Sequence, residues 1–260
     1  AIGIYTGAGP LQLAAHPAIG DRPVLGAEVE LIPVDAATRL PSPIESGDPD
    51  EGTPTLPVIR RVAARGGVIV IPAFAVGRAQ ALMLHIARLR ERKEIPRVPV
   101  YLNSPMATDV TRIYHDHRRE HRLDRDETEA MCRAATIVTS AEESKRLNKS
   151  RGPMVIIAGS GMATGGRIVH HLSAFAEDPR NMIVLAGFQA GGTRGAAILG
   201  GAKSVRIFGE DVPIGAEVVG LDGLSAHADS DELIAWAKRL PHAPRRTFVT
   251  HGEAAASDAF

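Results

Sequence analysis

Cysteine is almost absent from this sequence, which has only Cys132 among its 260 residues. One cysteine forms neither an internal disulfide nor a cysteine-based zinc site, and such sparse use suits a reducing cytoplasm. We therefore expect a cytoplasmic protein. Aromatic residues are also scarce, at 4% of the chain. The sequence leaves few side chains that could stack on nucleobases, so any recognition of a nucleic acid would rest on backbone and shape.

An excess of one charge is missing as well. Lys and Arg together number 30, and so do Asp and Glu. The net charge therefore gives no hint of a polyanionic partner, and any basic groove must be local. No apolar run reaches membrane-spanning length, and no signal-peptide pattern opens the sequence, so we expect no membrane partner. A hydrophobic fraction of 44% is that of an ordinary globular protein with one large domain or two smaller ones.

Short apolar runs alternate with amphipathic segments through the middle of the chain. Buried strands are predicted at residues 68–71, 98–102, 137–138, 154–158 and 182–186. Helices are predicted at residues 58–65, 79–90, 108–133, 141–147, 167–175 and 193–199. This alternation predicts an α/β fold with a parallel sheet, whose functional loops lie at the carboxyl ends of the strands. Shorter strands predicted at 205–208 and 216–220 suggest a second sheet.

Three turns follow predicted strands directly, at residues 72–78, 103–107 and 159–166. All three would open onto one edge of the sheet. Glycines let backbone N–H groups approach a phosphate, and Arg78 could clamp two phosphate oxygens. We interpret this edge as a phosphate track. Two plainer readings stay open: Arg78 covers the sheet end or pairs with a carboxylate, and Ser104 only forms the turn.

Two histidines in the last fifty residues indicate a chemistry most directly. His227 lies in the stretch 225–229 and His251 in the stretch 248–253, each beside small residues at the edge of a predicted element. A histidine held at such an edge near a carboxylate is how a zinc ligand or a proton donor is often presented. The alternatives are a residue beside a helix cap for His227 and a backbone-bonded histidine for His251.

The remaining histidines favour plainer interpretations. His115, His117 and His121 lie among several arginines, but acidic residues interleave the whole segment 112–127. Because phosphate binding needs clusters of one sign, a solvated helix face of mixed charge is favoured there. His170 and His171 fall inside a predicted helix, where surface or half-buried positions are expected.

The turns and the two histidine motifs together resemble the β-CASP domain of metallo-β-lactamase-fold nucleases. The matching segments are residues 71–80, 103–107, 159–162, 187–189 and 192–193, with 225–227 and 249–253 after them. This family contains RNA endonucleases related to the cleavage and polyadenylation specificity factor nuclease and, more distantly, RNase J. The resemblance covers about residues 58 to 258.

The resemblance implies a fold and a division into domains. We expect an α/β protein with a parallel-rich β-CASP sheet flanked by helices, joined to a C-terminal portion of a metallo-β-lactamase αβ/βα domain. Three parts are expected. Residues 1–57 form an irregular N-terminal remnant, for which the metallo-β-lactamase domain is the candidate source; residues 58–203 form the β-CASP domain, and residues 204–260 form the C-terminal part of the metallo-β-lactamase domain.

The resemblance also implies roles for individual residues. His227 resembles the histidine that contacts the scissile phosphate and protonates the leaving group, and His251 resembles a zinc ligand. The stretch 45–48, which contains Glu45, is a shortened candidate for the family's catalytic Glu-Ser-Thr-Tyr-Gly-Asp motif. Residues 20–23 are a competing candidate for the same motif. Contacts to phosphate or RNA are expected from Arg78, Ser104, Ser160, Gly161, Met162 and Ser225.

Family enzymes use two zinc ions to activate a hydroxide that attacks the RNA phosphodiester. Their His-x-His-x-Asp-His ligand cluster does not occur in this sequence, and Ala8 stands where one alignment would put a bridging aspartate. We therefore expect a zinc-dependent RNA endonuclease of this family, represented here by a truncated form that is inactive by itself.

Two other functions are alternatives. The first is a non-catalytic RNA-binding or assembly subunit that has lost the metal site. The second, a Rossmann-like nucleotide-binding protein, is disfavoured because no Gly-x-Gly-x-x-Gly opens a strand–helix–strand unit. Single-stranded RNA is the expected partner, and a homodimer is the assembly considered.

Overall fold

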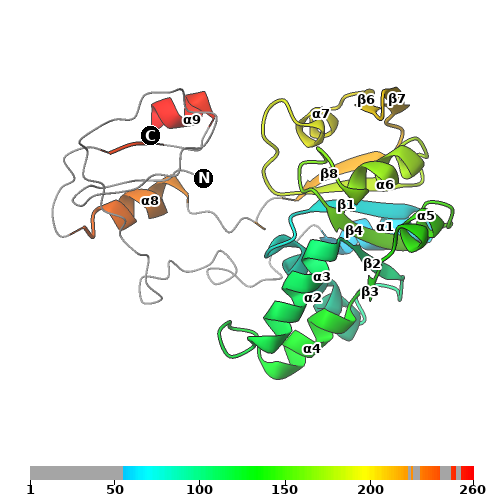
Figure 1. The fold of residues 1–260 in the computed structure, drawn as a ribbon, viewed down its shortest axis with the longest axis horizontal. Coiled ribbons are helices and arrows are strands. Elements are labelled where there is room, and N and C mark those ends of the chain that lie inside the picture. The colour runs from blue at the N-terminus through cyan, green and yellow to red at the C-terminus, as the bar shows by residue number, and fades with distance from the viewer. Residues whose placement is uncertain (1–54, 222–223, 225–228, 241–246, 250–252) are drawn as a thin grey trace. The chain divides into compact units, whose positions relative to one another are not determined.

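The computed structural model describes residues 55–221, 224, 229–240, 247–249 and 253–260. The chain divides into two compact units, one of residues 47–225 and the other of residues 1–46 together with 226–260. The larger unit contains a sheet with helices on both faces (Figure 1). The domain boundaries predicted at residues 57/58 and 203/204 stay a prediction.

Six strands form the main sheet, in the order β3-β2-β4-β1-β5-β8, and each of the five pairings is parallel. Their bounds are Val68–Ala73 for β1, Val100–Asn103 for β2, Thr136–Ile137 for β3, Met154–Gly159 for β4, Met182–Ala186 for β5 and Glu217–Leu221 for β8. The expected α/β fold with a parallel sheet is confirmed. All residues of β1 and β5 are buried, as expected for strands covered on both faces.

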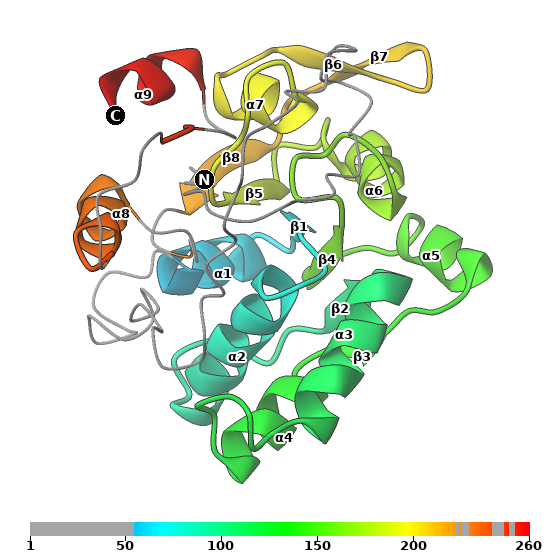
Figure 2. The same cartoon turned by 60° about the vertical axis from the view of Figure 1, so that its left-hand side comes forward.

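The helices of the larger unit surround this sheet (Figure 2). Their bounds are Thr55–Ala64 for α1, Arg78–Glu91 for α2, Pro105–Asp116 for α3, Arg125–Arg133 for α4, Ala141–Leu147 for α5, Arg167–Phe175 for α6 and Arg194–Leu199 for α7. Alternate residues of β1 point to opposite faces, so Ile69 and Ile71 pack with α1, α2 and α4, whereas Val68 and Val70 pack with α5, α6 and α7. Two apolar layers result, one on each face.

The segment 108–133, predicted as one helix, forms two helices. α3 ends at Asp116, and a new helix begins after Asp124, whose side chain accepts a hydrogen bond from the Glu127 N–H. Glu127 in turn binds the Asp124 N–H, which completes a capping box. The single-helix prediction was wrong because this cap, and not a glycine or proline, divides the segment.

The strand predicted at 216–220 belongs to the main sheet and not to a second one. It forms β8, which pairs in parallel with β5 from Met182↔Glu217 to Ala186↔Leu221. The second sheet is a hairpin of β6 (Ser204–Ile207) and β7 (Glu210–Pro213), which was not predicted as such. Local periodicity could not distinguish these partners, because pairing depends on residues far away in the sequence.

The described part of the smaller unit contains two helices, α8 (Ser230–Ala237) and α9 (Ala254–Ala259). A capping box of Asp229 and Glu232 begins α8. Among the described helices of both units, none is long and apolar enough to cross a membrane.

Candidate functional site

The connections that leave two neighbouring strands, β1 and β4, run toward opposite edges of the sheet: β1 leads to β2, toward the β3 edge, and β4 leads to β5, toward the β8 edge. The helix that follows β1, α2, packs on one face, where Leu82 joins the cluster of Ile71. The helix that follows β4, α6, packs on the other face, where Ile168 joins the cluster of Val70. Ligands of open α/β sheets bind beyond the carboxyl ends of the strands at such a switch point. This position is therefore the candidate site.

The strand register brings the three predicted turns to this one edge. Ala73 at the end of β1 pairs with Gly159 at the end of β4, and Asn103 at the end of β2 pairs with Ala158. The prediction that these turns share an edge is confirmed. We call this edge the rim, defined as residues 74–78, 103–107, 160–166 and 187–189.

Arg78 is the most informative residue of the rim. It begins α2, is partly buried, and its Nε and Nη1 atoms are shielded from solvent without a hydrogen-bond partner among the described residues. This burial lowers the pKa of Arg78 from its usual value. No described carboxylate pairs with it, so the predicted alternative of an ion pair finds no support. A buried, unpartnered guanidinium is costly, and an anion would satisfy it.

Gly187 leaves the space that the Arg78 guanidinium occupies. A Cβ added to Gly187 would lie 2.8 Å from Arg78 Nη2, and the φ of Gly187, 88°, is itself one that side chains rarely adopt. Nearby, Gln189 is buried and donates from Nε2 to the carbonyls of Gly161 and Gly187. Its Oε1 has no partner in the described part of the chain. Gln189 thus ties the turn after β4 to the turn after β5.

The turn after β4 holds three of the predicted phosphate-contacting residues. Ser160 has a φ of 86°, unusual for a residue other than glycine, and its Oγ accepts a hydrogen bond from the Thr164 N–H. Gly161 is buried against the ring of Phe74, which a Cβ at Gly161 would approach to 2.6 Å. The Met162 carbonyl accepts from the Gly195 N–H. The turn is therefore held rigidly at the rim.

Ser104 lies at the rim with its hydroxyl directed into the fold. It is 7% exposed and caps α3, where its Oγ accepts a hydrogen bond from the Ala107 N–H at 3.3 Å. A Cβ added to Gly159 would lie 3.0 Å from the same Oγ. The structure therefore gives Ser104 a capping function, and its contact with RNA stays a prediction.

Two phenyl rings of the rim are accessible for stacking. Phe74 is 48% exposed and Phe188 is 65% exposed. Single-stranded nucleic acids stack their bases on exposed aromatic rings of this kind.

A buried polar network closes the β2 side of the rim, and sequence reasoning missed it. The Asn103 Nδ2 amide donates to Ser144 Oγ at 2.8 Å and to His171 Nε2 at 2.7 Å, while Arg167 donates to Asn103 Oδ1 at 2.6 Å. His171 Nδ1 therefore carries the proton and donates to Asn148 Oδ1 at 2.6 Å. His171 is fully buried, which is not the surface or half-buried position expected from its helix.

Burial lowers the pKa of His171 to about 4, with further lowering by the charges of His170 and Arg167. The ring is therefore neutral at neutral pH, as its acceptor Nε2 requires. The sequence signal that could have revealed this network is weak, since Asn103, Ser144 and Asn148 lie far from His171 along the chain.

The arginine- and histidine-rich segment of α3 and α4 has paired charges. His117 lies 2.9 Å from Glu120, and Glu129 accepts a hydrogen bond from Arg125 and forms an ion pair with Arg133 at 3.3 Å. The hydrogen bond with Glu120 raises the pKa of His117. The mixed charge of this segment agrees with the prediction, but the residues lie on two helices and the loop between them and not on one helix face.

The predicted metal and catalytic residues Glu45, Ser225, His227 and His251 lie outside the described residues. Among the residues that are described, no three His, Cys, Asp or Glu side chains converge as a metal site requires. The described residues therefore do not fit a zinc ion, and the roles of the four predicted residues stay predictions.

Comparison with known proteins identifies the parts of the chain. Residues 79–198 match the family described as Beta-Casp domain, and residues 211–260 match the family described as Zn-dependent metallo-hydrolase RNA specificity domain. These two matches cover most of the segment for which the resemblance was predicted.

Several curated proteins are similar to this chain. A ribonuclease of Thermus thermophilus is 40% identical over 207 residues, which are 76% of this chain and 46% of that protein. Transcription termination factor FttA of Methanosarcina mazei is 35% identical over 75% of this chain and 32% of its own length. An RNase J-like protein of Methanocaldococcus jannaschii is 29% identical over 87% of this chain and 52% of its own length.

The chain thus spans between a third and about half of the length of these relatives. The fold, the rim turns, both family matches and these relatives agree with one another. The chain belongs to the β-CASP family of metallo-β-lactamase-fold ribonucleases.

Proposed function

We propose that this chain is the RNA-binding β-CASP portion of a zinc-dependent RNA endonuclease. The observation that carries the proposal is the partly buried guanidinium of Arg78 at the switch point of the sheet, where two of its nitrogens have no partner among the described residues. A phosphate group supplies the oxygens that these nitrogens lack. Single-stranded RNA fits better than a duplex, because the exposed rings of Phe74 and Phe188 on the same rim can stack only on unpaired bases.

Different rim residues have different roles in binding the RNA strand. Arg78 donates N–H groups to one phosphate, and the turn at Ser160 brings its backbone and hydroxyl to the same edge of the sheet. Gln189 keeps the turns after β4 and β5 in fixed positions. Zinc, which the name of the matched RNA specificity domain implies, would supply hydrolytic chemistry when bound, with His251 as a predicted ligand and His227 as a predicted proton donor.

The relatives support both RNA-directed hydrolysis and the alternative function. Two of those described are named as a ribonuclease or as RNase J-like, and another is named as a transcription termination factor. A non-catalytic RNA-binding or assembly subunit therefore stays the second hypothesis. The expected inactivity of this chain gains no support from these comparisons. A homodimer and a cytoplasmic location also stay proposals.

The experiment that tests the proposal measures RNA binding, zinc content and cleavage on one sample. The purified chain is supplied with zinc, and its affinity for a fluorescein-labelled single-stranded RNA is measured by anisotropy, with a duplex of the same sequence as the control. We expect the single strand to bind more tightly than the duplex, and we expect added salt to weaken RNA binding. Failure to bind single-stranded RNA at low salt would contradict the proposal.

Elemental analysis and a cleavage assay on the same sample separate the two hypotheses. About two zinc ions per chain together with cleavage identify a nuclease. RNA binding without zinc or cleavage identifies the non-catalytic alternative for this chain.

A further inference from the structure

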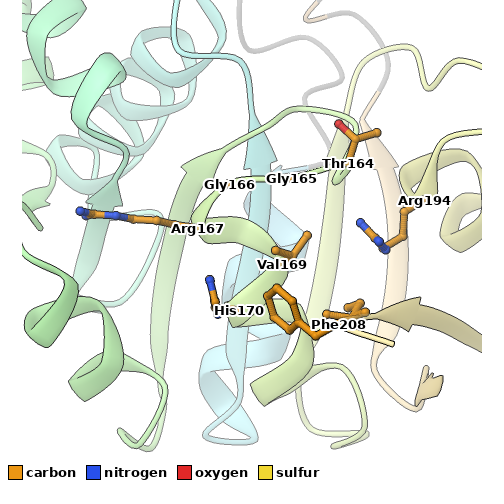
Figure 3. Close-up of a pocket in the computed structure, with 9 residues that line it drawn as sticks. Thr164, Gly165, Gly166, Arg167, Val169, His170, Arg194 and Phe208 are labelled. Atoms are coloured by element: carbon orange, nitrogen blue, oxygen red, sulfur yellow. The ribbon is translucent and has the colours of Figure 1, made fainter. Parts of the chain in front are cut away.

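A pocket adjoins the rim on the face of the sheet that α6 covers and shares residues 164–166 with it. It has a volume of about 470 Å³ and lies between the turn after β4, helix α6, the start of α7 and the β6–β7 hairpin (Figure 3). Its volume lies in the range of small-ligand sites. Its lining residues are Thr164, Gly165, Gly166, Arg167, Val169, His170, Arg194, Ile207 and Phe208.

Phe208 occupies an unusual place at this pocket. With Gly209 it forms the two-residue loop between β6 and β7, and both residues have positive φ, 52° and 87°. Such loops favour Asn-Gly, because a bulky side chain at positive φ is strained. The phenyl ring is also 65% exposed, so the fold buries little of its apolar surface. Neither the backbone nor the burial of apolar surface explains a phenylalanine here.

The ring of Phe208 meets that of His170, which projects from the exposed side of α6. The two ring centroids lie 4.6 Å apart with an angle of 34° between the ring planes. Figure 3 shows the two side chains next to each other at the pocket. The two rings together form an aromatic surface, and part of the Phe208 ring stays accessible. The base of a nucleotide stacks on such a surface.

The charge of the pocket favours an anion. No Asp or Glu is among its lining residues. In Figure 3 the guanidinium of Arg194 is turned toward the pocket, whereas that of Arg167 is turned away from it. Arg194 donates to the carbonyls of Ala163 and Arg206, which hold the guanidinium in place without neutralising it, and it forms no ion pair with a described residue. Its positive charge therefore stays available to a phosphate.

We propose that this pocket binds one nucleotide, with the base stacked on Phe208 and His170 and the phosphate held by Arg194 and the Thr164 hydroxyl. The site is continuous with the rim, because Thr164 and Ser160 belong to one turn and their hydroxyl oxygens lie 3.1 Å apart. A strand that crosses the rim at Ser160 thus reaches the pocket through that turn. The proposal rests on the proposed function only in naming RNA as the polymer; the nucleotide chemistry itself follows from the pocket.

The test uses 2-aminopurine, a fluorescent base that is quenched when it stacks on an aromatic ring. Single-stranded RNAs carrying 2-aminopurine at successive positions are titrated with the full chain and with variants at position 208. We expect quenching at one position with the wild type, loss of that quenching with Phe208→Leu, and retention with Phe208→Tyr, which keeps the aromatic face. The affinity of the Leu variant should fall about ten-fold, as for loss of one base stack. Circular dichroism confirms that both variants fold.

Two further arms separate the outcomes. In the first, 2-aminopurine 5′-monophosphate replaces RNA: quenching that depends on Phe208 supports the site with a free nucleotide as its ligand, and quenching with RNA alone supports it with the polymer. In the second, Phe188→Leu removes a phenyl ring of equal exposure from the rim. If the Phe208→Leu variant quenches 2-aminopurine and binds RNA as the wild type does, the pocket proposal is overturned. The proposed function survives that result when Phe188→Leu still weakens RNA binding, and it fails too when the wild type binds no RNA.

Discussion

The two ends of the central strands are built differently. At the amino ends of β1 and β5, the side chains of Asn181 and Arg65 are paired: Asn181 accepts from the Val68 N–H at 2.8 Å and donates to the Phe175 carbonyl at 2.9 Å, and Arg65 donates to the carbonyls of Arg180 and Asn181. At the carboxyl ends of β1 and β5, two nitrogens of Arg78 and the Oε1 atom of Gln189 lack partners among the described residues.

Packing differs in the same direction. A Cβ at Gly67, just before β1, would lie 1.9 Å from the Arg180 carbonyl oxygen, so backbones meet closely there. At the rim, in contrast, large apolar side chains such as Phe74 and Phe188 are exposed. Buried polar groups without partners cost stability, and proteins keep such costs where a ligand removes them, while exposed aromatic rings offer a ligand a surface for stacking. The comparison agrees with a role of the amino ends in stabilising the fold and with the ligand-binding role that we propose for the carboxyl ends.

We expect the largest effect on stability from a substitution at the amino end of β1. Gly67→Ala places a Cβ against the Arg180 carbonyl oxygen, which belongs to the backbone and cannot rotate away. We expect the free energy of unfolding in urea to fall by about 3 kcal/mol. Gly66→Ala is the matched control, because nothing lies within 4 Å of its added Cβ and only its φ of 68° is strained; it should cost about 1 kcal/mol. Equal losses in the two variants would show that close packing at Gly67 is unimportant.

The buried network around His171 gives the next effect, which is a pH dependence. The pKa of His171 is about 4 in the folded chain, below its value of 6.5 in the unfolded chain. Between these values only the unfolded chain takes up the proton, so stability is full above pH 6.5 and falls as the pH drops toward 4. The loss should approach about 3 kcal/mol. His171→Gln should flatten this part of the stability curve, and an unchanged slope in that variant would contradict the assignment.

The smallest effect concerns Ser104, where the rim and the fold meet. Ser104→Ala removes the N-cap of α3 and should lower the free energy of unfolding by about 1 kcal/mol. Because the hydroxyl is buried and already bonded to the Ala107 N–H, we expect RNA affinity to stay unchanged. A drop in affinity without a matching loss of stability would support the predicted contact of Ser104 with RNA instead.

The sequence predicted most elements of the larger unit because their signals are local. β5 and α5 have the predicted bounds, since β5 is a continuous apolar run and α5 begins at the capping serine Ser140. The position of β8 beside β5 and the β6–β7 hairpin could not be predicted, because strand pairing is not a local property.

The sequence also predicted the candidate site in part. The strand–turn pattern placed Arg78, Ser104 and the 160–162 turn at one edge, and the parallel register confirms that placement. Whether a side chain has a partner was not predictable, because partners come from distant segments: His171 meets Asn103 across 68 positions. The capping of Ser104 and the lack of partners at Arg78 both depend on the folded structure.

The most direct test of the comparison removes one arginine from each end of the sheet. Affinity for labelled single-stranded RNA is measured over a salt series for the wild type, Arg78→Met at the carboxyl end and Arg65→Met at the amino end. We predict that Arg78→Met lowers affinity about ten-fold and reduces the salt slope by about 1, as for one lost phosphate contact, while Arg65→Met changes neither. Equal losses in the two variants, or an unchanged affinity with Arg78→Met, would contradict the claim that the rim binds RNA through Arg78.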